Sequence, residues 1–287
     1  MIFDISHRTL FRYSAPVAQS QHVVHMSPRP VDGQTIRNHS LLIEPAPANR
    51  TSFDDAFGNP VVMIDIEMPH KELVLHARSS IETRRGPPKD LSGSTAWDRL
   101  DRREGGIDFD VVQYRCVSRM TTPSLDIADY ASQSFPPDRP ILQGAFDLTQ
   151  RVYRDFTFDA TATDISTPIT EVFETRRGVC QDFAHLALAS LRALRIPARY
   201  ISGYILTSPP PGKAKLQGTD ASHAWISVWA PETGWVDFDP TNGVVVGNAH
   251  VTIAHGRDYD DVSPISGVLI GGGEHTVTVG VDVVPTP

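Results

Sequence analysis

The chain has 287 residues, of which 40% are hydrophobic, and its formal net charge is -8. This length and apolar content are sufficient for a large buried core, arranged as one large domain or two smaller ones. The acidic balance argues against a nucleic-acid-binding protein or a polybasic membrane module.

The first 85 residues contain a series of short apolar segments with period-two alternation. Turn-forming residues separate them, as at Ser14-Ala15-Pro16. We therefore predict an N-terminal β-strand domain over residues 1–85, arranged as a β-sandwich. Its histidines share no metal-ligand spacing, and the acidic turn at residues 54–59 lacks the ligand pattern of a calcium loop.

The N-terminal segment has no basic region followed by an apolar one, so we expect no signal peptide. No apolar run approaches the ~20 residues that a membrane helix requires. The two cysteines, Cys116 and Cys180, do not make a disulfide framework. These observations favour a soluble, cytoplasmic protein with neither a membrane nor a nucleic-acid partner.

Residues 86–106 are rich in proline, glycine and charge, and we interpret them as a linker or exposed loop. A second domain is predicted over residues 107–287. It begins with a connecting strand at residues 111–117, which would place Cys116 in the core. Helices are expected at residues 123–131 and 141–154, and a further helix opens at Thr167-Pro168 and closes at Gly178.

Cys180 is predicted to begin the next helix. Apolar residues recur at helical spacing from residue 180 to residue 195, and Pro197 ends the pattern. A cysteine at a helix N-terminus lies at the positive end of the helix macrodipole, which favours the thiolate over the thiol. Such a thiolate is a nucleophile at neutral pH. The alternative is a buried structural cysteine, which is the commoner role of a single cysteine.

Three strands are predicted after this helix, at residues 198–206, 222–229 and 234–240. A turn at residues 232–234 makes the second and third strands a hairpin. His223, near the start of one strand, and Asp239, at the end of the next, then lie at the same edge of the sheet. Asp237 is a rival for Asp239, and we assign it to the opposite sheet face.

These three residue types suit nucleophilic catalysis. Cys180 would supply the thiolate, and His223 would take its proton and return a proton to the leaving amine. Asp239 would fix the imidazole tautomer and support the imidazolium. The backbone N–H of Cys180 could hold the oxyanion. A metal site formed by the same three residues is the competing interpretation, and it lacks a fourth ligand and any pair at short range.

The C-terminal tail contains a polar loop at residues 254–264. Residues 267–273 and 276–284 are predicted to form a final hairpin that completes the second domain.

Three sequence blocks, in this order, resemble the transglutaminase-like superfamily. Residues 177–186 resemble its nucleophile block, residues 222–225 its histidine block and residues 235–242 its aspartate block. Residues 1–85 are similar to the β-strand domain that precedes the core in bacterial members. The tail from Ala254 to Pro264 also resembles this bacterial subgroup.

The resemblance implies an α+β chain with a papain-like core, in which a helix-borne cysteine packs on an antiparallel sheet. It implies a Cys180-His223-Asp239 triad and neither a cofactor nor a metal. Further residues expected to bind the oxyanion or line the substrate are Gln181, Trp225, Asp258 and Tyr259, although a structural ion-pair network is an equal explanation for the last two. Phe156-Thr157-Phe158 stands where relatives often carry an aromatic hydroxyl, so Gln181 or a backbone N–H would replace that donor.

The expected activity is acyl transfer from a peptide or isopeptide amide through a thioester on Cys180, with hydrolysis favoured. A protein or peptide is therefore the expected partner, and the oligomeric state is left open. Two alternatives remain: a protein-glutamine transglutaminase that uses an amine acceptor, and a non-catalytic peptide-binding module of the same fold.

Overall fold

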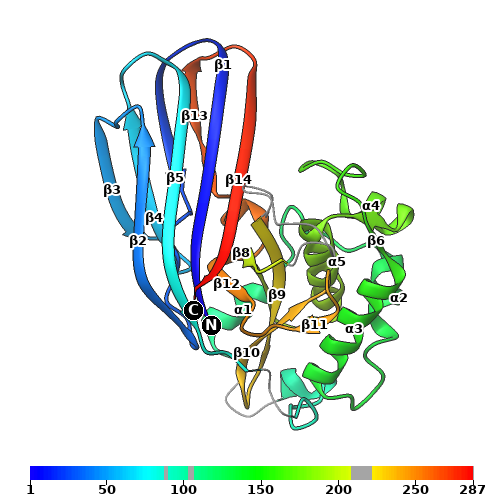
Figure 1. Cartoon of the computed structure of the whole chain (residues 1–287). Coiled ribbons are helices and arrows are strands. Elements are labelled where there is room, and N and C mark those ends of the chain that lie inside the picture. The colour runs from blue at the N-terminus through cyan, green and yellow to red at the C-terminus, as the bar shows by residue number, and fades with distance from the viewer. Residues whose placement is uncertain (87–89, 103–106, 208–221, 287) are drawn as a thin grey trace, which may run out of the picture.

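A computed structural model describes residues 1–86, 90–102, 107–207 and 222–286. Two regions are evident in Figure 1: a sandwich of long strands, and a mixed region of helices and a second sheet. The predicted linker falls partly on residues 87–89 and 103–106, which lie outside the described residues. No helix in the described ranges is both long enough and apolar enough to cross a membrane.

The sandwich is organised around β1 (Ile2–Val24), which takes part in both layers. Its first half, through Tyr13, lies between β5 (His70–Thr83) and β14 (His275–Thr286). Its second half, from Val17, lies between β4 (Pro60–Ile66) and β13 (Ile265–Gly271). The outer strands are β2 (Gln34–Glu44) and β3 (Asn49–Asp54). The turn predicted at Ser14-Ala15-Pro16 is instead a bend within one continuous strand.

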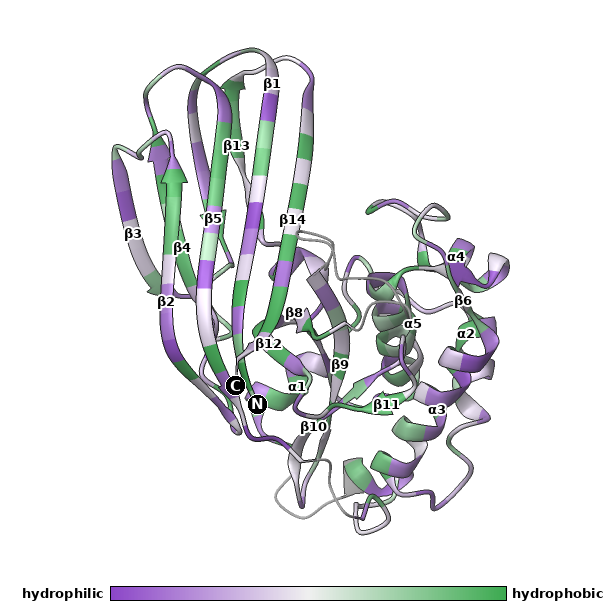
Figure 2. Cartoon of the chain, viewed as in Figure 1, coloured by the Kyte–Doolittle hydropathy of each residue, from purple (hydrophilic) through white to green (hydrophobic). Residues whose placement is uncertain are grey.

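Alternation of apolar and polar residues explains the two layers. Figure 2 shows hydrophobic and hydrophilic positions alternating along β5, β1 and β14. The inward-facing side chains form a buried cluster between the layers, which includes Val17, Leu41, Ile64 and Leu75. Burying one face of each sheet in this way is the stable arrangement for antiparallel strands.

The C-terminal strands belong to the sandwich, which differs from the prediction. β13 and β14 both pair antiparallel with β1, so the tail returns to the first sheet and does not complete the second. The two chain ends consequently lie side by side, with Ile2 opposite Thr286.

The segment before the main helices is helical, not extended. Instead of a strand at 111–117, the chain forms α1 (Phe109–Val112) and the 3-10 turn η2 (Gln113–Arg115), preceded by η1 (Trp97–Arg102). Val111 and Tyr114 are buried three residues apart, a spacing that puts both side chains on one face of a helical turn but on opposite faces of a strand. Cys116 is exposed, so its predicted place in the core is wrong.

The remaining helices surround one central helix. They are α2 (Leu125–Ser132), α3 (Ile141–Asp155), α4 (Ile169–Thr175) and the central α5 (Cys180–Ala193). α5 is buried over most of its length and contacts α2, α3 and α4 as well as the sheet. The short strands β6 (Thr157–Phe158) and β7 (Arg177–Gly178) pair in parallel just before it.

The second sheet has the order β11-β10-β9-β8-β12. Its strands are β8 (Ala198–Ile205), β9 (Ser222–Ala230), β10 (Gly234–Asp239), β11 (Val244–Val245) and β12 (His250–Gly256), and the turn η3 (Tyr259–Asp261) follows. All pairs are antiparallel, as predicted for β8 to β10. Tyr200, Ala224, Ile226 and Phe238 face α5 and share one buried cluster with it.

Candidate active site

Cys180 is the first residue of α5, and its side chain is half-buried. The preceding turn is fixed by Asp182, whose carboxylate accepts hydrogen bonds from the Val179 N–H at 2.8 Å and the Thr163 hydroxyl at 2.6 Å. Valine has no side-chain acceptor, so this is one half of a capping box. α4 ends at Arg176, which has φ 57°, so Gly178 does not close that helix as predicted.

His223 and Asp239 lie at one edge of the second sheet. His223 is the second residue of β9 and Asp239 is the last of β10, and both side chains are buried. His223 Nε2 lies 2.7 Å from Asp239 Oδ2. This contact leaves Nδ1 as the ring nitrogen that can face the thiol.

Cys180, His223 and Asp239 form one electrostatic unit. Burial disfavours a charged imidazole, but hydrogen bonds with Asp239 and Cys180 outweigh it and raise the pKa of His223 to about 10. Burial also opposes ionisation of Asp239, yet its hydrogen bonds with His223 and His250 leave its pKa well below the usual value. The folded protein therefore favours an imidazolium next to a carboxylate.

Asp239 accepts hydrogen bonds from more groups than the predicted histidine. Its Oδ2 also lies 3.0 Å from His250 Nε2 and accepts a bond from Asn242 Nδ2 at 2.7 Å. Its Oδ1 accepts the Thr241 and Asn242 backbone N–H groups at 2.9 and 3.2 Å. These contacts hold the carboxylate in one orientation, with one oxygen directed at His223.

Sequence reasoning missed His250. It lies at the start of β12, three strands away from β10 in the sheet, so no short-range spacing links it to Asp239. His223, Asp239 and His250 place three donor atoms within 4.8 Å of one another, a set that could bind a divalent ion. The two rings already direct their Nε2 atoms to the same carboxylate oxygen, so hydrogen bonding accounts for the arrangement.

Asp237 lies on the same sheet face as His223, contrary to the predicted opposite face. It pairs with Ser227 in the ladder and accepts a hydrogen bond from Trp225 Nε1 at 3.2 Å. Residues two apart in a strand share a face, so alternation alone cannot separate Asp237 from Asp239. Contact with His223 distinguishes Asp239.

Trp225 packs against the two histidines of the site. Its side chain is fully buried, and its ring lies 6.0 Å from the His223 ring and edge-on to the His250 ring at 5.2 Å. With its N–H bound to Asp237, it is a packing platform for both histidines.

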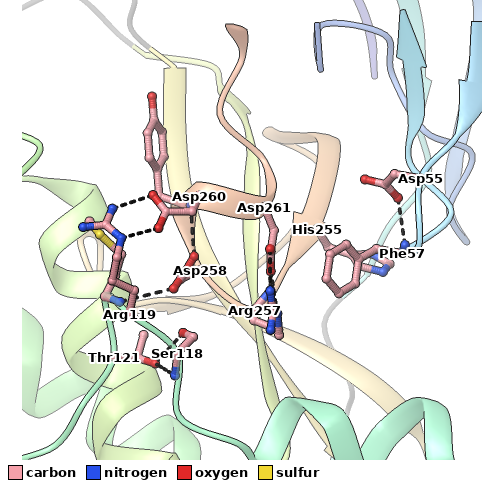
Figure 3. A network of polar contacts seen from close by, with 12 residues as sticks. Asp55, Phe57, Ser118, Arg119, Thr121, His255, Arg257, Asp258, Asp260 and Asp261 are labelled. Carbon is pink, nitrogen blue, oxygen red and sulfur yellow. Dashed lines mark hydrogen bonds and ion pairs between the residues drawn. The ribbon is translucent and has the colours of Figure 1, made fainter. Parts of the chain in front are cut away.

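Asp258 and Tyr259 belong largely to a structural network, and Figure 3 shows the part of it around Asp258. Asp258 is buried and accepts hydrogen bonds from the Met120 and Asp260 backbone N–H groups. Asp260 forms a double hydrogen bond with Arg119, and Arg257 pairs with Asp261. The Tyr259 N–H donates to His185 Nε2 at 3.2 Å, and burial lowers the pKa of that histidine to about 3. The contacts of residues 257–261 are therefore those of a structural ion-pair network, the alternative given for Asp258 and Tyr259.

Gln181 and Tyr200 complete the surroundings of the thiol. Gln181 is half-buried in the first turn of α5. Tyr200, which sequence reasoning did not single out, is buried on β8, with its ring near that of Tyr259. Burial raises the pKa of Tyr200 well above its usual value, so it keeps its hydroxyl proton.

Two protein-family models match this chain, one in the sandwich and one in the mixed region of helices and a second sheet. Residues 3–82 match the bacterial transglutaminase-like N-terminal region, and residues 129–240 match the transglutaminase-like superfamily. The chain belongs to the transglutaminase-like superfamily. The second match spans Cys180, His223 and Asp239, and membership supports cysteine-based catalysis in general terms.

The similarity of this transglutaminase-like chain to known proteins covers nearly its whole length. An uncharacterized protein of Mycobacterium tuberculosis is 38% identical over 292 residues, covering 99% of this chain and 92% of that protein. An uncharacterized protein of Mycobacterium leprae is 28% identical, with 90% of each chain covered. A crystal structure from Cytophaga hutchinsonii, of a protein provisionally called a cysteine protease, superposes with a TM-score of 0.75 at 22% identity, covering 100% of this chain and 92% of that one. The predicted fold class is confirmed by these matches.

Proposed function

We propose that this protein is a cysteine hydrolase that cleaves peptide or isopeptide amide bonds through a thioester on Cys180. The observation that carries the proposal is the hydrogen-bonded series from Cys180 through His223 to Asp239 at the N-terminus of a buried helix. A structural cysteine would not require an oriented imidazole and an ionised carboxylate behind it.

In the acylation step, His223 holds the thiol proton and the Cys180 sulfur attacks the amide carbonyl carbon. The carbon–sulfur bond forms, and the carbonyl electrons move to oxygen. When the tetrahedral intermediate collapses, the carbon–nitrogen bond breaks and the imidazolium of His223 gives its proton to the leaving amine. The high pKa of His223 supports the ion pair that precedes attack.

Stabilisation of the oxyanion is assigned to donors at the start of α5. The backbone N–H of Cys180 lies at the positive end of the helix dipole, where negative charge is favoured. Gln181 in the same turn is the proposed second donor.

In the deacylation step, water replaces the amine. His223 takes a proton from the water while the water oxygen attacks the thioester carbon. The carbon–sulfur bond then breaks, a carboxylic acid product leaves, and the Cys180 thiolate is restored beside the imidazolium of His223. Asp239 keeps its negative charge throughout and supports the imidazolium.

Transfer to an amine is the second candidate. A protein-glutamine gamma-glutamyltransferase of Pseudomonas aeruginosa is 41% identical over 71 residues, which cover 24% of this chain and 11% of that protein. An amine would then attack the same thioester in place of water. The proposed chemistry on Cys180 is unchanged, and only the acceptor differs.

A peptide and isopeptide library, incubated with and without a primary amine and scored by mass spectrometry, would identify the reaction. We expect cleavage products without added amine, no effect of a chelator, and loss of all products in Cys180→Ala. The matched control is Cys116→Ala, which removes an exposed thiol and should leave turnover unchanged. Amine-linked products alone would favour the transferase. No product, together with unchanged peptide binding in Cys180→Ala, would indicate a non-catalytic module.

A further inference from the structure

A cavity of about 870 Å³ lies between the sandwich and the second sheet. Loops of the sandwich contribute Arg29, Arg84 and Arg85, and β8 contributes Arg199. Arg199 lies on the sheet face opposite Tyr200 and α5, since adjacent strand residues alternate between faces. The cavity is therefore lined by basic residues from both regions of the molecule.

Several buried guanidinium nitrogens here have no hydrogen-bond acceptor among the described residues. They are Arg29 Nε, Arg85 Nε, Arg85 Nη1 and Arg199 Nε. A buried charged donor left without an acceptor is costly, and such groups usually have an explanation in a bound ion or water. Four such nitrogens, in side chains that line one cavity, point to an anionic ligand.

The contacts that these arginines do make leave their charge largely uncompensated. Arg85 Nη2 donates to the neutral oxygens of Gln34 and Thr252 at 3.2 and 3.0 Å. Arg199 lies over the Trp235 ring, 4.3 Å from its centroid. Arg29 donates to the Phe57 carbonyl at 2.9 Å and to the Asn59 side-chain oxygen at 2.7 Å.

The carboxylates in the cavity are fewer than the arginines. Asp32 and Asp237 line it beside the four arginines, and the nearest approach of Asp237 to Arg85 is 3.8 Å. His255, also in the lining, adds no negative charge, and burial with nearby Arg199 and Arg29 lowers its pKa to about 2. Burial lowers the pKa of Arg29, Arg85 and Arg199, and the nearby carboxylates only partly oppose this effect: Asp54 and Asp55 act on Arg29, and Asp237 acts on Arg85 and Arg199.

We propose that this cavity is a binding site for a phosphate group, either free phosphate or a phosphomonoester. The guanidinium fork matches phosphate oxygens in paired hydrogen bonds, which is why arginines gather at phosphate sites. The apolar wall formed by Val31, Ile201 and Val246 and the volume of the cavity leave room for an organic body on the phosphate.

The arginine-lined cavity is separate from the site around Cys180. Fully buried Trp225 lies between them, with its N–H on Asp237 and its ring against the His250 ring. Binding of phosphate in this cavity requires no hydrolase activity at Cys180. Binding can therefore be measured in Cys180→Ala protein, so that failure of one proposal is distinguishable from failure of the other.

Isothermal titration calorimetry of the full chain with inorganic phosphate and with phenyl phosphate, at constant ionic strength, tests the site. We expect one saturable site, with affinity reduced about tenfold or more in Arg85→Gln and in Arg199→Gln, because each loses a charged donor. Tighter binding of phenyl phosphate would identify a phosphomonoester ligand, and tighter binding of inorganic phosphate would identify the free ion.

Arg12→Gln is the matched control, because it removes an equal charge from an exposed arginine paired with Glu72. It should bind as the unaltered chain does. If Arg199→Gln does not fold, Arg84→Gln at the exposed side of the cavity takes its place. Absence of saturable binding, equal affinities in all variants, or tighter binding of succinate than of phosphate would overturn the proposal.

Discussion

At the scale of single residues, the carboxylate of Asp239 is the best-supported group in the site. Two histidines, one amide and two backbone N–H groups direct their donors at it. An acceptor with several donors is held more firmly than one in a single pair, and its charge is shared among them. His250 is thus placed to orient Asp239, and through it His223.

Replacing His250 tests this positioning role. His250→Phe keeps a ring against Trp225 but removes the donor to Asp239, so we expect kcat to fall about tenfold or more. Asp239 would also act more strongly on His223, so the basic limb of the pH–rate profile should move to higher pH. His250→Gln, which can still donate, should recover part of the rate. A rate loss with an unmoved profile would indicate packing alone.

The same pair predicts how stability depends on pH. The pKa of His223 is raised from 6.5 to about 10, so its contribution is complete below pH 6.5 and is lost as the pH rises toward 10. The pKa of Asp239 is lowered from 3.8, so its contribution is complete above that value and is lost as the pH falls through the folded-state pKa. The pair should stabilise most between about pH 4 and 6.5.

Urea unfolding of His223→Gln across this range measures the effect. The loss in free energy of unfolding relative to the unaltered chain should be largest near pH 6 and should shrink steadily toward pH 10. His275→Gln removes an exposed histidine and should show no such dependence. A loss that grows with pH would contradict the assigned charge states.

At the scale of elements, Gly203 determines how closely β8 and β12 approach around Trp225. A Cβ at this position would lie 2.1 Å from the Val251 carbonyl oxygen and 2.5 Å from the Trp225 ring. Gly203 is also the ladder partner of His223. The absence of a side chain here allows the platform under both histidines to form.

Gly203→Ala should therefore damage both stability and turnover. A backbone oxygen cannot move aside as a flexible side chain can, so we expect a loss of about 1–3 kcal/mol in the free energy of unfolding, or more. Displacement of Trp225 should lower kcat and change the intrinsic fluorescence. Gly247→Ala, where a Cβ meets no atom within 4 Å, is the control and should be nearly neutral. Equal effects in the two variants would refute this explanation.

The elements nearest the site were predictable because local patterns decide them. The helix that begins at Cys180 and the strands carrying His223 and Asp239 lie where periodicity places them. The 111–117 strand was wrong because the buried residues of this short apolar segment, Val111 and Tyr114, are three apart, which is a helical spacing. His250 and Asn242 were missed because only the tertiary fold brings them to Asp239, and the face of Asp237 was misassigned although alternation gives it correctly.

At the scale of the whole molecule, the sandwich and the mixed region of helices and a second sheet share one apolar core. Phe3 and Ile81 of the sandwich and Val281 of β14 belong to the same buried cluster as the residues of α5. Asn59 is fully buried, and its side-chain amide binds the backbone of His255 on β12: Nδ2 donates to the carbonyl at 2.8 Å and Oδ1 accepts from the N–H at 2.9 Å. Because these contacts span both regions, the regions should unfold together.

Val281→Ala tests this coupling from the C-terminal strand. Val281 is fully buried, so we expect a loss of roughly 1.5–3 kcal/mol in the free energy of unfolding. All four tryptophans lie between residues 97 and 235, outside the sandwich, whereas circular dichroism also reports the sandwich strands. If the regions are coupled, the variant shifts the midpoints of both signals equally.

The control for Val281→Ala lies on the same strand. Val279 is 51% exposed, so Val279→Ala should change neither midpoint appreciably. If Val281→Ala shifts the circular dichroism transition and leaves the tryptophan transition in place, the sandwich unfolds by itself. In that case the shared cluster would be a contact between independently stable units, and loss of the C-terminal strand would leave the proposed thiol site folded.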